Sequence, residues 1–229
     1  MARETKVETT NTPVAVPIDG QSLPGDLGMP TEPHGIVLFA HGSGSSRHSP
    51  RNQYVARTLE HRHLGTLLID LLTPEEEAID DRTAEYRFDI PMLARRLVTI
   101  VDWLRLRKET ASLPIGLFGA STGGGAALIA AAERPREIAA VVSRGGRPDL
   151  ADAALPKVTT PTLLIVGGFD APVIEMNRDA MKQMRGDVKL EIVPGATHLF
   201  EERGTLERVA ELAGTWFAKH LQPAVPARP

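Results

Sequence analysis

Residues 119–123 have the sequence Gly-Ala-Ser-Thr-Gly, which fits the G-x-S-x-G pattern of a nucleophilic serine. The pattern follows an apolar run at 115–118 and precedes small residues at 124–132, so it stands where a strand would turn into a helix. Such a turn strains the serine backbone, and the flanking glycines leave room for the chain while the hydroxyl projects. The helix start also favours negative charge nearby. The pattern predicts that Ser121 is a nucleophile for acyl transfer.

Two other interpretations of this turn must be weighed. It could be a glycine-rich turn without chemistry, or a dinucleotide site, because Gly119, Gly123 and Gly125 also fit the G-x-x-x-G-x-G turn of short-chain dehydrogenases. Those enzymes carry the turn on their first strand and a Tyr-x-x-x-Lys pair further on. Here the turn is central, and the residues four places after the two tyrosines are Thr58 and Ile90. A P-loop is excluded because the chain has no G-x-x-x-x-G-K-[ST].

A candidate acid and a candidate base follow Ser121 along the chain. Asp170 comes after the apolar run 163–166, and His198 comes after the run 190–193. In α/β hydrolases the chain order is Ser, Asp, His, and parallel strands bring the loops that follow them to one edge of the sheet. Taken alone, Asp170 would be a helix N-cap and His198 an ordinary loop histidine. Their positions predict that His198 is the general base and that Asp170 orients it.

The loop at 41–46, with the sequence His-Gly-Ser-Gly-Ser-Ser, follows another apolar run. Backbone N–H groups in such a turn can stabilise the oxyanion of acyl transfer, and loss of one donor typically costs about 10²–10³ in rate. We expect the oxyanion hole to consist of the N–H of Ser43, or alternatively Gly44, and that of Thr122. His41 is interpreted as a histidine that braces the loop through backbone hydrogen bonds.

Three arginines, Arg47, Arg144 and Arg147, fall in loops that this topology places near the mouth of the site. Their guanidinium groups could bind a carboxylate of the substrate. The alternative, which we favour, is that they brace loops or form ion pairs with Asp70 and Asp149.

Alternating apolar runs and helix-period segments predict a parallel sheet with helices on both faces. The predicted strands are 36–40, 66–69, 115–118, 139–142, 163–166 and 190–193, and the clearest amphipathic helices span 93–104 and 206–217. Residues 1–33 contain five prolines, four of which are expected to break this region into short antiparallel edge strands.

The fold class predicted is therefore α/β, with a mostly parallel sheet and an antiparallel N-terminal edge. A single domain is expected over 1–229, with a frayed, proline-rich tail at 222–229. Only about 18 residues, 144–161, join two core strands where larger relatives of this architecture insert a cap, so we expect a minimal cap and an open mouth.

Composition narrows the function classes. The 229 residues carry a net charge of −3, which argues against nucleic acid as a partner. Apolar runs are strand-sized and no secretory signal is evident, so no membrane association and a cytoplasmic location are expected. The chain has no cysteine, so the nucleophile is not sulfur. The acidic run 75–77 after Pro74 is typical of a helix first turn, and we expect neither a metal nor a cofactor.

On these residues the chain resembles the α/β-hydrolase superfamily over nearly its whole length, and specifically the dienelactone hydrolase-like family. The segments HGSGSSRHSPRN at 41–52 and SRGGRPD at 143–149 are similar to one bacterial subgroup of that family. The resemblance implies an α/β-hydrolase fold with the triad Ser121, Asp170 and His198. Authentic dienelactone hydrolases use a cysteine nucleophile, so Ser121 argues against dienelactone itself as the substrate.

The predicted function is hydrolysis of small carboxylic esters or lactones through an acyl-enzyme. Two alternatives stay open at this point. The same triad could transfer the acyl group to an acceptor other than water, or the chain could bind a ligand in an inactive site of this fold. The oligomeric state is not predicted.

Overall fold

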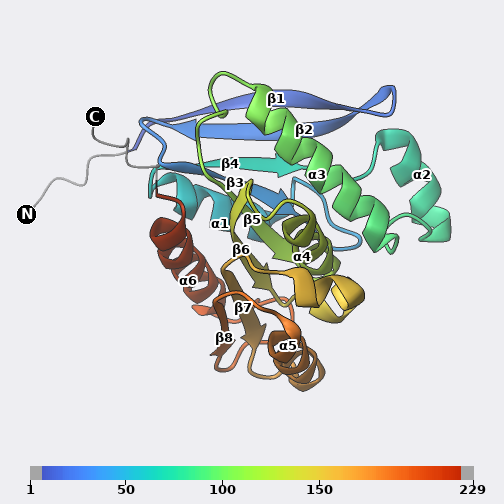
Figure 1. The fold of residues 1–229 in the computed structure, drawn as a ribbon, viewed down its shortest axis with the longest axis vertical. Coiled ribbons are helices and arrows are strands. Elements are labelled where there is room, and N and C mark those ends of the chain that lie inside the picture. The colour runs from blue at the N-terminus through green and yellow to red at the C-terminus, as the bar shows by residue number, and fades with distance from the viewer. Residues whose placement is uncertain (1–6, 223–229) are drawn as a thin grey trace, which may run out of the picture.

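The computed structural model describes residues 7–222, whose strands form one eight-stranded sheet in the order β1-β2-β4-β3-β5-β6-β7-β8 (Figure 1). Strands β3 to β8 run parallel to one another, and β1 and β2 pair antiparallel at one edge. The strands are β1 (Thr9–Ile18), β2 (Gln21–Pro30), β3 (Gly35–Ala40), β4 (Leu64–Ile69), β5 (Ile115–Ala120), β6 (Ile138–Arg144), β7 (Thr162–Gly167) and β8 (Val188–Val193). All six predicted parallel strands and the fold class are confirmed.

The N-terminal edge differs from the prediction in one respect. β1 and β2 are two unbroken strands of ten residues each, although they contain the prolines expected to break them. β1 is the outermost strand, where a missing N–H donor is tolerated. Pro24 lies in β2 just before the pairing with β4, which begins at Gly25, and its carbonyl accepts a hydrogen bond from the Asp70 N–H. The expected frayed tail falls, apart from Gln222, outside the described residues.

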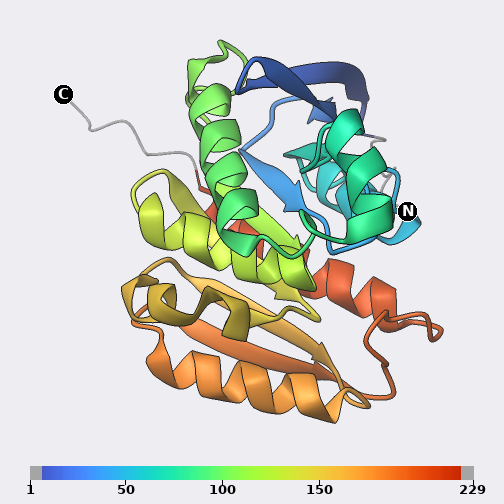
Figure 2. The same ribbon diagram turned by 90° about the vertical axis from the view of Figure 1, so that its right-hand side faces the viewer.

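Helices cover both faces of the sheet. α1 (Pro50–Glu60) and α6 (Thr205–His220) lie on one face. The opposite face, seen in Figure 2, carries α3 (Ile90–Leu106), α4 (Thr122–Glu133) and α5 (Ala171–Gln183). Two shorter elements complete the chain: α2 (Pro74–Thr83) and the 3₁₀ helix η1 (Pro148–Lys157). The predicted amphipathic helices correspond to α3 and α6.

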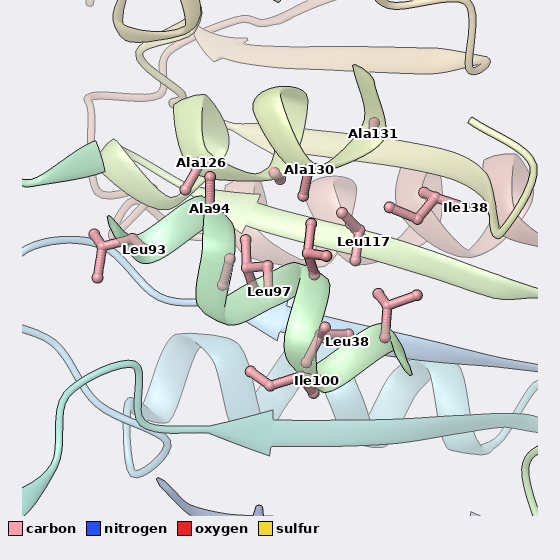
Figure 3. Packing of buried hydrophobic residues seen from close by; sticks show 14 of the residues in the cluster. Leu38, Leu93, Ala94, Leu97, Ile100, Leu117, Ala126, Ala130, Ala131 and Ile138 are labelled. Atoms are coloured by element: carbon pink, nitrogen blue, oxygen red, sulfur yellow. The ribbon is translucent and has the colours of Figure 1, made fainter. Parts of the chain in front are cut away.

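Strand alternation divides the core into two layers. In β3, Ile36 and Leu38 pack towards α3 and α4, whereas Val37 and Phe39 pack towards α1 and α6. Figure 3 shows the first layer, in which Leu97 of α3 and the small alanines of α4 approach the sheet closely. β8 was expected to be apolar throughout, but it is an edge strand and only Val193 is buried.

Parallel orientation places the ends of β3, β5, β6, β7 and β8 at one edge of the sheet, so the loops that follow them meet there. Between β6 and β7 the chain forms only η1, in agreement with the expected minimal cap. Within residues 7–222, no helix has the length and apolar character needed to cross a bilayer.

Candidate active site

Ser121 lies between β5 and α4 with φ 51° and ψ −120°, a backbone conformation rare for a residue with a side chain. Strain of this kind typically costs about 1–3 kcal/mol and clusters at functional sites. The surrounding glycines make the turn possible. A Cβ on Gly119 would lie 2.6 Å from the Gly123 carbonyl oxygen, and a Cβ on Gly123 would collide with the carbonyl oxygen of Ala40. Ser121 occupies the N-cap position without capping α4, so its hydroxyl is not engaged by the helix.

Asp170 and His198 lie side by side, as the sequence predicted. His198 Nδ1 is 2.6 Å from Asp170 Oδ2, and the imidazole is 39% exposed whereas the carboxylate is 13% exposed. Asp170 is at the N-cap of α5 but makes no capping hydrogen bond, so its side chain orients the histidine instead of closing the helix. This contact fixes the Nδ1–H tautomer and leaves Nε2 able to accept a proton.

The end of β6 connects this pair to Ser121. The Ser121 N–H donates to the Arg144 carbonyl at 3.2 Å. The next residue, Gly145, lies against the His198 ring, since a Cβ built on Gly145 would be 3.5 Å from Nδ1. The structure therefore brings all three predicted triad residues to the same edge of the sheet.

The loop after β3 is braced by His41. Its Nε2 accepts the Leu71 N–H at 3.0 Å, and its Nδ1 lies 3.0 Å from the Gly42 carbonyl, so both ring nitrogens engage the backbone as expected. Desolvation lowers the pKa of His41, with opposing contributions from the Gly42 carbonyl and Asp70. A neutral imidazole is required here, because a protonated ring could not accept from Leu71.

The predicted oxyanion donors lie next to one another. The Ser43 N–H donates a hydrogen bond of 2.9 Å to the Thr122 hydroxyl. In this structure the predicted oxyanion donor is therefore already bonded to a side-chain oxygen. Gly44, the alternative donor, has φ 67° and faces Arg87.

A cavity of about 160 Å³ opens beside Ser43 and Thr122. Its other walls come from the segment that follows β4, from α2, from the segment before α3 and from the first turn of α3, and they include Asp80 and Arg87. In the sequence, the acidic run 75–77 indicates only a helix first turn, and nothing there marks this segment as a wall of the site. No sequence motif identifies Asp80 and Arg87 as residues of the cavity wall, because they come together only through the turn that ends α2.

Asp80 holds that turn together. It is 2% exposed and accepts hydrogen bonds from the N–H groups of Tyr86 and Arg87 and from Arg87 Nε. Burial alone would raise the pKa of Asp80, but these hydrogen bonds, those from Arg87 first, outweigh it and the pKa lies below its usual value. The pair is a fixed, charged component of the cavity wall.

The three loop arginines have different environments. Arg47 forms an ion pair with Asp70 and a longer contact with Asp26, and Arg147 pairs with Asp149 through two bonds of 2.8 and 2.7 Å. Arg144 is different, because it is 8% exposed and, within the described residues, its Nε and Nη1 have no hydrogen-bond partner. Bracing therefore accounts for two of the three.

Metal binding has no candidate in this part of the chain. Among residues 7–222, no three His, Cys, Asp or Glu side chains are grouped so that they could hold an ion.

Comparison with known proteins adds the following. The profile of the dienelactone hydrolase family matches residues 60–220. A crystal structure of a dienelactone hydrolase from Anabaena variabilis is 59% identical, with a TM-score of 0.92, and the match covers 93% of this chain and 99% of that one. A serine hydrolase without lid from Xanthomonas campestris, at 19% identity, TM-score 0.73 and coverage of 97% and 98%, shares the fold.

A Mycobacterium tuberculosis protein with the provisional name phosphoribosyl transferase is 58% identical over 197 residues. The match covers 86% of this chain and 44% of that relative. The chain thus spans less than half the length of these curated relatives.

Proposed function

The chain belongs to the dienelactone hydrolase family, and from this premise we propose that it hydrolyses small carboxylic esters or lactones through an acyl-enzyme on Ser121. The observation that carries the proposal is the strained Ser121 beside the hydrogen-bonded pair of Asp170 and His198. A glycine-rich turn without chemistry would need neither the strain nor the pair.

In the proposed reaction, His198 Nε2 accepts the hydroxyl proton as Ser121 Oγ attacks the substrate carbonyl carbon. Asp170 stabilises the imidazolium that forms. His198 then gives the proton to the leaving alkoxide as the C–O bond breaks. Water attacks the acyl-enzyme in the second half, with His198 again taking a proton and returning it to Ser121.

The oxyanion is expected to bind between the N–H groups of Ser43 and Thr122. In the free protein the Thr122 hydroxyl accepts the Ser43 N–H, so the substrate oxygen would replace it as acceptor. This exchange keeps the donor satisfied before and after binding, which avoids the penalty of a buried unpaired N–H.

Small substrates fit the surroundings best. The cavity beside Thr122 holds only about 160 Å³, and η1 is too short to form a lid over a long apolar channel. Short acyl or alcohol groups are therefore proposed. The phosphoribosyl transferase name belongs to longer relatives, and we do not extend that activity to this chain.

The test is labelling with a fluorophosphonate together with hydrolysis of short 4-nitrophenyl esters. Ser121→Ala should lose labelling and at least about 10⁴-fold in kcat, since removing the nucleophile of a triad typically costs about 10⁶. Ser112→Ala, at an exposed position, is the matched control and should keep both. Wild-type protein that neither labels nor hydrolyses any ester would contradict the proposal and favour a ligand-binding role. Faster release of product with added alcohols than with water alone would favour acyl transfer.

A further inference from the structure

The turn that joins β6 to η1, residues 144–147, holds Ser121 by both of its backbone polar groups. The Ser121 N–H donates to the Arg144 carbonyl at 3.2 Å, and the Ser121 carbonyl accepts the Arg147 N–H at 3.0 Å. Ser121 has a strained backbone, and such strain persists only where the surrounding structure fixes it. The position of the 144–147 turn therefore helps to determine where the Ser121 hydroxyl lies.

The same turn packs against the proposed general base. Gly145 has φ 51°, and a Cβ built on it would lie 3.1 Å from the His198 carbonyl oxygen and 3.5 Å from the ring atoms Nδ1 and Cε1. Glycine suits this place because it adopts a left-handed conformation without steric cost and lets the backbone approach the ring. A displacement of the 144–147 turn would therefore move Ser121 and His198 relative to each other.

Asn177 of α5 fastens this turn from the side of the helix. Its Nδ2 donates to the Gly146 carbonyl at 3.0 Å and to the Val173 carbonyl, one turn earlier in α5, at 2.8 Å. The side chain of Asn177 is fully buried, so water does not compete for either bond. The bond to Val173 fixes the direction of the amide, and the bond to Gly146 ties the 144–147 turn to α5.

The helix that carries Asn177 also carries Asp170. Asp170 is the N-cap of α5, and Asn177 follows it by seven positions, which is close to two helical turns and places both on one face. Asp170 contacts His198 directly, whereas Asn177 fixes the turn that packs on the His198 ring. One rigid helix thus sets the orientation of the imidazole and the position of the turn that holds Ser121.

The amide of Asn177 is unfavourable for packing alone. Its Oδ1 is buried and has no hydrogen-bond partner among the described residues. An unsatisfied buried acceptor of this kind typically costs about 1–3 kcal/mol. A leucine, of similar volume, would fill the same space without that cost. The donor bond to Gly146 is what distinguishes asparagine from an apolar residue at this position.

We propose that Asn177 is a positioning residue for the reaction. Its bond to the Gly146 carbonyl holds the 144–147 turn where the Ser121 hydroxyl and His198 Nε2 can exchange a proton. The inference rests on the ester hydrolysis proposed above. Asn177 acts only through this turn, so its loss should slow the chemical step and leave binding in the cavity beside Thr122 almost unchanged. A misplacement of about 1 Å between reacting groups can cost about 10²-fold in rate.

The kinetic test uses Asn177→Leu and Asn177→Ser with 4-nitrophenyl acetate at pH 7.5. Leucine fills the space without a donor, whereas serine can keep a bond to the Val173 carbonyl but is too short to reach Gly146. Both variants should lose about 10- to 100-fold in kcat with KM nearly unchanged. Because they differ in volume, a loss of kcat that both share reports the missing bond to Gly146, and either variant suffices if the other does not fold.

Thr110→Val is the matched control for the Asn177 variants. Thr110 is fully buried and donates to the Leu104 carbonyl at 2.6 Å, in the segment before β5 and so at the opposite end of the sheet from Ser121. Its loss should lower the Tm as the loss of the Asn177 bond does, but leave kcat unchanged. Full kcat in a folded Asn177 variant would overturn the inference, and so would an equal loss of kcat in Thr110→Val.

An NMR measurement separates this inference from the proposed function. The ring nitrogens of His198 are followed in ¹⁵N–¹H correlation spectra and assigned by the loss of their signals in His198→Gln. These signals should shift in Asn177→Leu and Asn177→Ser and stay in place in Thr110→Val, whether or not the protein hydrolyses esters. Wild type without esterase activity would contradict the proposed function alone. Unshifted His198 signals in the Asn177 variants would overturn the positioning role.

Discussion

The two sides of Ser121 differ in how their charges are compensated. On the side of α2, Asp80 pairs with Arg87 and Asp70 pairs with Arg47, so this wall is complete within the protein. On the side of α1 and α6, Arg144 is buried and lacks a partner in the described chain. Paired charges make the first wall stable, whereas a buried charge without a counter-charge is expected to lower the stability of the second.

The largest effect that could break this comparison is expected from Asp80→Asn. Removing the charge leaves Arg87 and two backbone N–H groups poorly compensated, and the free energy of unfolding should fall by about 2–3 kcal/mol. This is below the value for a fully buried pair because the Arg87 side chain is 24% exposed. Urea unfolding of wild type and Asp80→Asn measures this change in the free energy of unfolding.

Asp81→Asn is the matched control for Asp80→Asn. Asp81 is 73% exposed and contacts Arg87 only at 3.4 Å, so the expected change is within about 0.5 kcal/mol. A loss of stability in Asp80→Asn no larger than that in Asp81→Asn would show that the buried pair does not hold the turn at the end of α2.

The contrast between the two walls could not be predicted from the sequence. Arg47, Arg144 and Arg147 are equivalent there, because which arginine finds a carboxylate depends on the direction of each side chain. The Asp80 and Arg87 pair was missed for a related reason. The pair requires a left-handed backbone conformation at Ala84, where α2 ends. Glycine is the usual sequence signal for this conformation, and position 84 is an alanine.

Features governed by local pattern were predictable. The apolar runs predicted the parallel strands. The acidic and basic residues in the loops after two of these strands predicted the pairing of Asp170 with His198, which the structure shows. The prediction that prolines break the N-terminal edge into short strands was wrong. A proline ends a strand only where the neighbouring strand needs a backbone N–H donor at that position. At the outer strand β1, Pro13 and Pro17 are tolerated.

A smaller effect, on stability against pH, should come from His41, which ties the oxyanion loop to the start of the α2 wall. Its folded-state pKa is lowered, chiefly by desolvation, so below pH 6.5 the unfolded chain binds more protons than the folded one. The contribution to stability is complete above that pH and is lost as the pH falls towards the folded-state pKa. The loss is at most about 1.4 kcal/mol per pH unit for one proton.

Urea unfolding at pH 7.5 and 5.5 tests the role of His41. The loss of stability between the two should be smaller in His41→Gln than in wild type. His48→Gln, an exposed histidine of the same loop, should lose as much as wild type. Identical losses in wild type and His41→Gln would show that His41 does not couple this loop to pH.

The smallest effect expected is on the N-terminus of α2. Thr73 and Glu76 form a capping box, in which the Thr73 hydroxyl accepts the Glu76 N–H and the Glu76 carboxylate accepts the Thr73 N–H. Thr73→Ala should cost about 1 kcal/mol and speed hydrogen exchange in α2. Thr83→Ala, at the exposed end of the helix, should cost a few tenths. Because α2 forms one wall of the cavity, Thr73→Ala should also raise KM for a short neutral ester by a modest factor. Unchanged hydrogen exchange in α2 of Thr73→Ala would contradict the stabilising role of this capping box.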